Sequence, residues 1–315
     1  MTGARILFMG PPDFANFSLR ALIEAGENVI GAVTQPDKPQ GRGYTLTPPP
    51  VKRYAEEQGI PVYQPKTLRG EEFAALLDEI DPDMIIVAAY GKILPENVIN
   101  YPKYGCINVH GSYLPQYRGA APMQRAIIDG NKYTGVTIMK MDVGLDTGDM
   151  ISRERIEIED GDNFETIHDK IGTVGAALLV STLPSIVDGT ALYEKQDEAC
   201  SSYAAKIEKS DCALDFEKSA EELHDLIRGL SPIPLSFTRT PDGKLLKVIE
   251  AKKTGKNTDR AAGTVVSVDG GIEVACGDGK TLTLLRVLPE GRSKMDASAF
   301  VRGRGIAVGD ILKWN

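Results

Sequence analysis

The amino-acid sequence predicts an α/β protein in which an open, mostly parallel, Rossmann-like sheet is followed by a small β-barrel. Up to about residue 190, short apolar runs alternate with stretches of helical periodicity, a pattern typical of consecutive β-α-β units. After residue 205, strand-like runs follow one another closely and are separated by Asp-Gly turns. The length of 315 residues fits two domains. We therefore predict an α/β domain over 1–205, with a linker from about 190, and a barrel domain over 206–315.

Each element of the first domain is predicted from the spacing of its apolar residues. A continuous apolar run is typical of a strand covered on both faces, and a period of 3.6 residues predicts an amphipathic helix. The expected strands are 5–10, 29–35, 60–64, 83–90, 105–112, 134–142 and 149–158. The expected helices are 14–26, 49–59, 71–80 and one or two within 163–189. Consecutive parallel strands should be joined by right-handed crossovers.

The second domain is expected to begin with one helix over 219–230. Ser219 is a suitable N-cap for this helix, and Glu222 three residues later completes a capping box. Short strands then alternate with tight turns, which are marked by Asp-Gly dipeptides at 242–243, 269–270 and 278–279. Several short strands at this spacing predict the small barrel.

The composition argues against several classes of protein. No uninterrupted apolar run of about 18 residues occurs, so no membrane span is expected. The N-terminus enters a strand-like run directly and lacks the successive segments of a secretion signal. Four scattered cysteines without a CxxC pair indicate neither a zinc site nor a disulfide framework: Cys106, Cys200, Cys212 and Cys276. We therefore expect a metal-free protein of the reducing cytoplasm.

The charge is unevenly distributed along the chain. The net charge of −8 argues against a general nucleic-acid binder. Residues 1–205 hold 18 Lys and Arg against 28 Asp and Glu, a net charge of −10, whereas residues 206–315 hold 18 against 16, a net charge of +2. This asymmetry fits either a basic face on the second domain or an unremarkable variation in solvated surface charge.

The turn after the first strand does not match a dinucleotide-binding fingerprint. Gly10 is followed by Pro11 and Pro12, whereas G-x-G-x-x-G needs two more glycines to let a pyrophosphate approach the backbone. No Walker-type phosphate loop occurs in the sequence. A nicotinamide-dependent oxidoreductase is therefore the weakest function class that this fold admits.

Asn108 and His110 end a strand-like run, where the ligand crevice of an open α/β sheet forms. Strand alternation places both side chains on one face. An amide and an imidazole together can polarise a carbonyl group and stabilise a developing oxyanion. The other two histidines, His168 and His224, lie on helical stretches and fit surface or core positions better. His110 is therefore the candidate catalytic histidine.

The segment MDVGLDTGDM at 141–150 has three interpretations. Its aspartates, Asp142, Asp146 and Asp149, could bind calcium, although the spacing does not fit an EF-hand. They could instead form Asx turns in an irregular loop. The third interpretation is that one aspartate orients His110 and favours its charged form. We favour the third, because this loop also follows a predicted strand and can fold over the same crevice.

These two segments together resemble the folate-dependent formyltransferases. Residues 108–122, NVHGSYLPQYRGAAP, are similar to that family's N-x-H-G-S-x-L-P-x-[YW]-R-G-x-x-P signature, and residues 141–150 are similar to its D-x-G-x-D-T-G loop. Further stretches resemble the members that act on methionyl initiator tRNA, namely 34–52, 88–95, 202–211 and 291–305. The resemblance covers essentially the whole chain.

The resemblance implies a reaction and a set of site residues. The reaction transfers a formyl group from 10-formyltetrahydrofolate to the α-amine of methionyl initiator tRNA for translation initiation, and the enzyme is expected to be a cytoplasmic monomer without a metal. The catalytic residues that it implies are Asn108, His110 and Asp146. The folate-binding residues that it implies are Tyr90, Gly91, Ile93, Ser112, Tyr113, Leu114 and Pro115. For the tRNA it implies Lys38, Arg42 and an OB-like second domain.

The sequence departs from the family pattern at three positions and leaves alternatives open. Pro11 replaces the usual Thr, Tyr113 the usual Leu, and Ile233 a common aromatic residue, but none of these belongs to the catalytic set. Without the resemblance, the loop at 36–47 fits a flexible surface loop. Within the same chemistry, the acceptor could be a sugar amine or a glycinamide ribonucleotide. A folate-binding or nucleic-acid-binding module without turnover is a further alternative.

Overall fold

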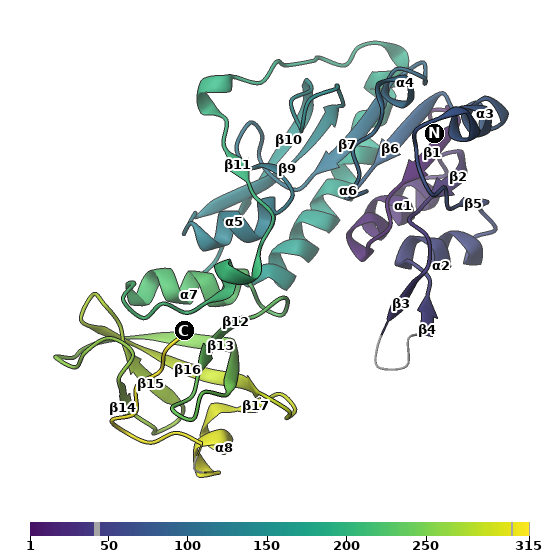
Figure 1. Ribbon diagram of the computed structural model, residues 1–315. Helices are drawn as coiled ribbons and strands as arrows, with labels where there is room; N and C mark the ends of the chain where they lie inside the picture. Colours follow the sequence, from purple (N-terminus) through teal and green to yellow (C-terminus); the bar gives the residue numbers. More distant parts are fainter. Residues whose placement is uncertain (41–44, 304, 315) are drawn as a thin grey trace. The chain divides into compact units, whose positions relative to one another are not determined.

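The computed structural model describes residues 1–40, 45–303 and 305–314 (Figure 1). The chain divides into two compact units, and each unit draws on more than one stretch of sequence. The first unit consists of Met1–Pro122, Thr134–Glu157 and His168–Ala204. The second unit consists of Met123–Tyr133, Ile158–Ile167 and Ala205–Asn315.

A seven-stranded sheet forms the centre of the first unit, in the order β10-β9-β7-β6-β1-β2-β5. The strands are β1 (Ile6–Met9), β2 (Val29–Val33), β5 (Val62–Tyr63), β6 (Met84–Val87), β7 (Cys106–His110), β9 (Tyr133–Lys140) and β10 (Met150–Glu157). Neighbouring strands from β7 to β5 are parallel, whereas β9 is antiparallel to β7. The chain runs outward from β1 to β5 and then returns to β6, so the strand order reverses between β1 and β6. Ligand crevices of open α/β sheets form at such a reversal.

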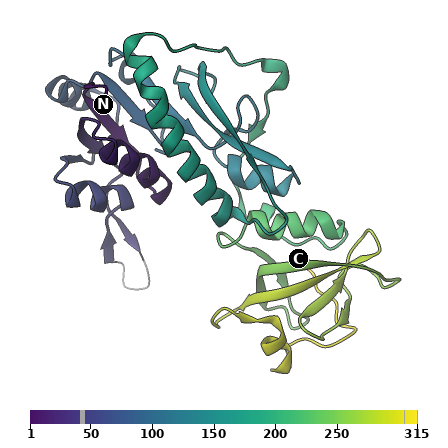
Figure 2. The ribbon, with the colours of Figure 1, turned by 180° about the vertical axis from the view of Figure 1, so that it is seen from behind.

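Helices cover both faces of this sheet, because its strands are apolar on both sides. One face carries α3 (Glu71–Ile80) and α4 (Glu96–Ile99), whose apolar residues pack with those of β1 and β6. Figure 2 shows α1 (Asp13–Glu24) and α6 (Phe164–Asp188) together on the other face. Of the other helices, α2 (Pro50–Glu57) lies beside β2 and β5, whereas α5 (Pro122–Ile128) belongs to the second unit except for Pro122.

The helix α6 is held on the sheet by two close approaches. A side chain at Gly172 would collide with the ring of Phe17 on α1, and one at Gly175 would press on Val109 and Val136. The region predicted as one or two helices is thus a single helix. By length and composition alone this helix could cross a membrane, a test that buried core helices also pass. Its apolar residues Ile171, Leu179 and Leu183 are fully buried.

The second unit is an antiparallel β domain with one long helix, α7 (Ala220–Gly229). Ser219 caps α7 as predicted, since its hydroxyl accepts the Glu222 N–H while the Glu222 carboxylate accepts the Ser219 N–H. The sheet order is β12-β13-β16-β15-β14, and β17 pairs with β16. The strands are β12 (Ser236–Arg239), β13 (Leu245–Asn257), β14 (Val265–Ser267), β15 (Ile272–Ala275), β16 (Lys280–Pro289) and β17 (Met295–Asp296), followed by α8 (Ala297–Arg302).

Residues 310–313 join the two edges of this sheet. At the β12 edge, the Arg239 N–H donates to the Lys313 carbonyl at 2.7 Å. Near the β14 edge, the Leu312 N–H donates to the Gly263 carbonyl at 2.9 Å, and the Val265 N–H donates to the Asp310 carbonyl at 2.8 Å. Both edges therefore have hydrogen-bond partners, which limits edge-to-edge association.

The predicted fold class, a parallel-dominated α/β sheet followed by a β domain, is confirmed. All seven strands predicted in the first domain are present, and the helix predicted over 71–80 is α3. The sequence did not predict the hairpin of β3 (Lys38–Gln40) and β4 (Thr45–Thr47) or the short helix α4. It also missed a two-stranded parallel pair of β8 (Arg118–Gly119) and β11 (Tyr203–Ala204).

Candidate active site

Asn108 and His110 lie on β7 at its carboxyl end, and both side chains are buried. Asn108 is in register with Val87 of β6, and His110 is in register with Thr137 of β9. Because they are two residues apart on one strand, their side chains share a face of the sheet. Within the described part of the chain, the Asn108 amide makes no side-chain hydrogen bond. Its donor group is therefore available to a ligand.

Each ring nitrogen of His110 faces an oxygen that only accepts hydrogen bonds. Nε2 lies 3.0 Å from the Tyr117 carbonyl oxygen, and Nδ1 lies 3.7 Å from Oδ2 of Asp146. The His110 side chain is 6% exposed and that of Asp146 is 15% exposed, so little water screens this pair. Nε2 is thus within hydrogen-bond distance of a carbonyl, whereas Nδ1 faces a carboxylate beyond that distance.

Asp146 reaches His110 from a loop with an unusual backbone. Its φ of +54° lies in the left-handed region, which costs free energy for most residues other than glycine. Oδ2 of Asp146 accepts the Gly119 N–H at 2.9 Å. The main-chain oxygens of Asp146 and Gly148 both accept from Nε2 of Gln196, each at 2.8 Å. The loop thus fixes both the carboxylate and the backbone behind it.

The glycines and the other aspartates of this loop have structural roles. A Cβ at Gly144 would collide with the Thr147 side chain, and one at Gly148 would collide with the Lys140 carbonyl. Oδ1 of Asp142 accepts from the Gly144 N–H at 3.0 Å and from the Thr147 hydroxyl at 2.7 Å, which is an Asx turn. Of the three aspartates, Asp146 is the one that the structure brings to His110. Among the residues that the structure describes, no group of three or more His, Cys, Asp or Glu is arranged to hold a metal.

Ser112 and Leu114, two of the residues predicted to bind folate, are buried inside the loop after β7. The Ser112 hydroxyl donates to the Gln116 carbonyl at 2.6 Å. The Thr137 hydroxyl donates to the Ser112 carbonyl at 2.8 Å and accepts the Leu114 N–H at 3.1 Å. These side chains therefore fix the course of the loop.

The remaining predicted folate residues lie after β6 and β7. Tyr113 is half-buried, with the guanidinium groups of Arg153 and Arg155 at 5.0 and 5.2 Å from its ring centre, and Pro115 is also half-buried. The Tyr90 phenol is buried and has no hydrogen-bond partner among the described residues, and burial raises the pKa of Tyr90 to about 12. Gly91 has a φ of +73°, and Ile93 is 76% exposed.

A segment that the sequence presented as a linker lies along this site. The Glu194 backbone exchanges two hydrogen bonds of 2.8 Å with Met150. Met150 directly follows the loop at 141–149 that carries Asp146, called the Asp146 loop below. Further along, the Ser202 hydroxyl accepts the Tyr117 N–H at 2.9 Å, and β11 pairs with β8. Residues 194–204 are mostly polar and have no regular apolar period, so sequence patterns gave no signal for this packing.

Comparison with known proteins identifies the family. A family model described as formyl transferase matches residues 4–183, and a model of the formyl transferase C-terminal domain matches residues 206–305. The methionyl-tRNA formyltransferase of Bacillus subtilis is 47% identical over 312 residues, which cover 99% of this chain and 98% of that protein.

The chain belongs to the formyl transferase family. The predicted family is thereby confirmed. The methionyl-tRNA formyltransferase of Clostridium novyi is also similar to this formyl transferase, at 45% identity over 98% of this chain and 100% of that protein.

Solved structures share the fold of this formyl transferase at low sequence identity. An N-formyltransferase from Helicobacter canadensis, in complex with folinic acid and dTDP-3-aminofucose, has a TM-score of 0.66 and 20% identity, covering 89% of this chain and 98% of that one. HypX from Aquifex aeolicus, in complex with tetrahydrofolic acid, has a TM-score of 0.64 and 16% identity, covering 96% of this chain and 47% of that one.

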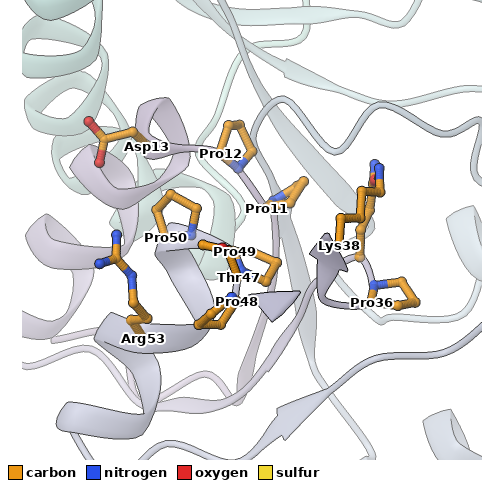
Figure 3. Close-up of a pocket in the computed structure, with 11 residues that line it drawn as sticks. Pro11, Pro12, Asp13, Pro36, Lys38, Thr47, Pro48, Pro49, Pro50 and Arg53 are labelled. Carbon is orange, nitrogen blue, oxygen red and sulfur yellow. The ribbon is translucent and has the colours of Figure 1, made fainter. Parts of the chain in front are cut away.

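The formyl transferase has a separate cavity of about 380 Å³ beside the first βα turn (Figure 3). Six prolines form much of its wall, and Asp13, Lys38 and Arg53 also line it. Nζ of Lys38 donates to Oε1 of Gln35 at 2.7 Å, so this predicted tRNA contact lies at the base of the β3–β4 hairpin. Arg42, the other predicted contact, lies outside the described residues. Asn108, His110 and Asp146 do not line this cavity.

Proposed function

We propose that this formyl transferase moves the formyl group of 10-formyltetrahydrofolate onto the α-amine of methionyl initiator tRNA, which prepares the tRNA for translation initiation. The observation that carries the proposal is the meeting of Asn108, His110 and Asp146 at the carboxyl end of β7. Similarity over nearly the whole length to methionyl-tRNA formyltransferases supports this choice of acceptor. The proposed enzyme acts as a monomer in the cytoplasm.

The reaction passes through a tetrahedral intermediate. The neutral amine attacks the formyl carbon, the carbonyl oxygen becomes an oxyanion, and the bond to N10 of the folate then breaks. The amine loses one proton and N10 gains one, so the number of protons is conserved. A positioned side chain or a water molecule has to carry that proton between the two nitrogens.

Asn108 and His110 stabilise the oxyanion in this proposal. Within residues 1–40, 45–303 and 305–314, the Asn108 amide donor has no partner, and Nδ1 of His110, 3.7 Å from the Asp146 carboxylate, has no short hydrogen bond that a substrate oxygen would need to break. Nε2 is held by the Tyr117 carbonyl, which fixes the ring plane. The Asp146 carboxylate, 3.7 Å from Nδ1, would stabilise positive charge on the ring while the oxyanion forms.

Exposed apolar side chains on two loops suit the folate ring. Ile93 is 76% exposed on the loop after β6, and Val143 and Leu145 are 64% and 51% exposed on the Asp146 loop. Exposed apolar groups at strand ends are typical of ligand contacts. We propose that Tyr90, Gly91, Ile93, Tyr113 and Pro115 contact the folate directly, and that Ser112 and Leu114 act by shaping the loop.

The tRNA contacts proposed are Lys38, Arg42 and the second unit. The balance of +2 over residues 206–315, against −10 over residues 1–205, would place the phosphates of the tRNA on the barrel. Lys38 and Arg42 would meet the acceptor end, where an arginine can bind a phosphate or an unpaired base.

The test is formyl transfer from 10-formyltetrahydrofolate to methionyl initiator tRNA, run beside unacylated tRNA and a His110→Ala variant. Transfer that requires both methionine and His110 supports the proposal. Asn100→Ala, at an exposed residue at the end of α4, serves as the matched control for Asn108→Ala. Transfer to a sugar amine or another small amine, with none to the tRNA, would replace the proposed acceptor.

A further inference from the structure

Gln196 is the exception in an exposed stretch of chain. From Leu192 to Cys200 every residue is exposed apart from Gln196, which is half-buried. Among the residues that the structure describes, its side chain makes three hydrogen bonds, two to carbonyls of the loop that carries Asp146 and one to Arg118 on β8.

We infer that Gln196 is a positioning residue, which holds the Asp146 loop so that the carboxylate faces His110. This inference rests on the proposed role of Asp146 in formyl transfer. In the described part of the chain the Gln196 side chain has hydrogen bonds to the Asp146 backbone but none to His110, so we expect it to act through that backbone.

The three partners of Gln196 match an amide and no other common side chain. Nε2 donates to the carbonyls of Asp146 and Gly148, both at 2.8 Å, and Oε1 accepts from Nε of Arg118 at 2.9 Å. Carbonyls only accept and a guanidinium only donates, so the orientation of the amide is unambiguous. A carboxylate would repel both carbonyls, and an apolar side chain would leave them without partners.

The Asp146 backbone needs such support because it is held in a left-handed conformation, with a φ of +54°. The hydrogen bonds within the loop hold Asp142, Gly144 and Thr147 but not the Asp146 carbonyl. Gln196, fifty positions away in sequence, supplies that anchor on both sides of Thr147. Without it, we expect the loop to relax and the carboxylate to move relative to His110.

The Gln196 amide also connects the Asp146 loop to β8, the strand that holds both Arg118 and Gly119. Arg118 precedes Gly119, whose N–H donates to the Asp146 carboxylate at 2.9 Å. Arg118 is in turn held by Glu198 through two hydrogen bonds of 2.8 and 3.0 Å. Glu198 is 73% exposed, so this ion pair contributes little by itself. Gln196 is therefore the member of the group whose removal is most informative.

The experiment compares Gln196→Met, which keeps the size but loses every hydrogen bond, with Gln196→Glu, which keeps the acceptor toward Arg118 and loses the donors. Because a displacement of about 1 Å in a catalytic group can cost about 100-fold, we expect turnover to fall about 10- to 100-fold in both variants. The KM for 10-formyltetrahydrofolate should stay within about twofold, since an interaction that acts in the transition state lowers kcat and kcat/KM equally. Gln58→Met, at an exposed glutamine after α2, is the matched control and should keep wild-type kinetics.

A double-mutant cycle separates positioning from a general structural effect. In an Asp146→Asn background, Gln196→Met should lower turnover by less than about twofold, because the charge that it positions is already absent. Wild-type turnover in both single variants, or losses that multiply in the double variant, would overturn the inference. If Gln196→Met does not fold, Gln196→Glu replaces it in the cycle. Wild-type turnover of Asp146→Asn alone would instead overturn the proposed role of Asp146, whereas a wild-type enzyme that transfers no formyl group to the tRNA would overturn the proposed function.

Discussion

Asp146→Asn tests the electrostatic role of Asp146 most directly. The substitution removes the negative charge beside His110, while the remaining amide oxygen can still accept the Gly119 N–H. We expect kcat to fall and the KM for 10-formyltetrahydrofolate to change little, because the charge acts on the oxyanion-bearing state and not on the bound folate.

The distance between the two groups sets the expected size of the effect. Nδ1 of His110 and Oδ2 of Asp146 are 3.7 Å apart. Two unit charges at such a distance attract each other by about 4 kcal/mol at an effective dielectric constant of about 20. Part of this attraction already acts before the oxyanion forms and does not lower the barrier. If half of it does, the loss is about 2 kcal/mol or about 30-fold in kcat, and the full value corresponds to about 1,000-fold.

The assay is single-turnover formyl transfer to methionyl initiator tRNA at saturating folate, with thermal unfolding measured on the same samples. Asp149→Asn changes a half-buried carboxylate on the same loop and is the matched control. A wild-type kcat for Asp146→Asn, or a loss confined to KM, would refute the reasoning. An equal loss in Asp149→Asn would show that the loop responds to charge in general.

Three further predictions concern the loop that carries Asp146, the second unit, and the proposed tRNA contacts Lys38 and Arg42. Gly148→Ala places a Cβ against the Lys140 carbonyl and should destabilise the protein by about 1–3 kcal/mol in thermal or chemical unfolding, whereas Gly161→Ala, with open space around its Cβ, should not. Hydrogen bonds from the Ser219 hydroxyl and N–H hold the pKa of Glu222 below its usual value. Between the two pKa values the unfolded chain therefore binds more protons than the folded protein. The stability that Glu222 provides is fully present above its usual pKa and is lost as the pH falls through the lowered pKa of the folded protein. Glu222→Gln should therefore be less stable than the wild type near neutral pH and equally stable in strong acid; a constant difference at every pH would contradict this. Lys38→Ala and Arg42→Ala should each reduce the slope of log affinity for tRNA against log salt by about 1 and leave folate binding intact, unlike the control Arg69→Ala, and an unchanged slope would remove them from the interface.

The elements that the sequence predicted well are those with a strong local period. In α3, apolar Phe73, Leu77 and Ile80 follow the helical spacing and are buried against the sheet, so the predicted and observed bounds agree. The meeting of His110 and Asp146 was predicted because both residues follow strand-like runs, and the structure brings them together for a different reason. Because β9 is antiparallel to β7, β9 ends with Lys140 beside Ile107, and the loop that follows has to return toward the carboxyl end of β7 to bring Asp146 to His110.

The parts that the sequence did not predict depend on hydrogen bonds between distant positions. Gln196 lies in a polar stretch without apolar periodicity, and its partners are main-chain carbonyls fifty and forty-eight positions away. Because every residue has a main-chain carbonyl, the amino-acid sequence does not show which carbonyl a side chain will bind. The pairing of β8 with β11 is equally short and non-local. Such contacts become visible once the backbone of both partners is known.

The left-handed backbone at position 146 restricts which amino acids can serve there. The proposed mechanism requires a negative charge here, and the backbone conformation favours glycine, asparagine and aspartate. Glycine and asparagine meet the second requirement without the first, and glutamate meets the first without the second. Aspartate alone among the standard residues satisfies both requirements, so no substitution at this position preserves both the charge and the backbone conformation. A designer who wishes to alter the specificity of this enzyme should therefore vary its neighbours and leave Asp146 unchanged.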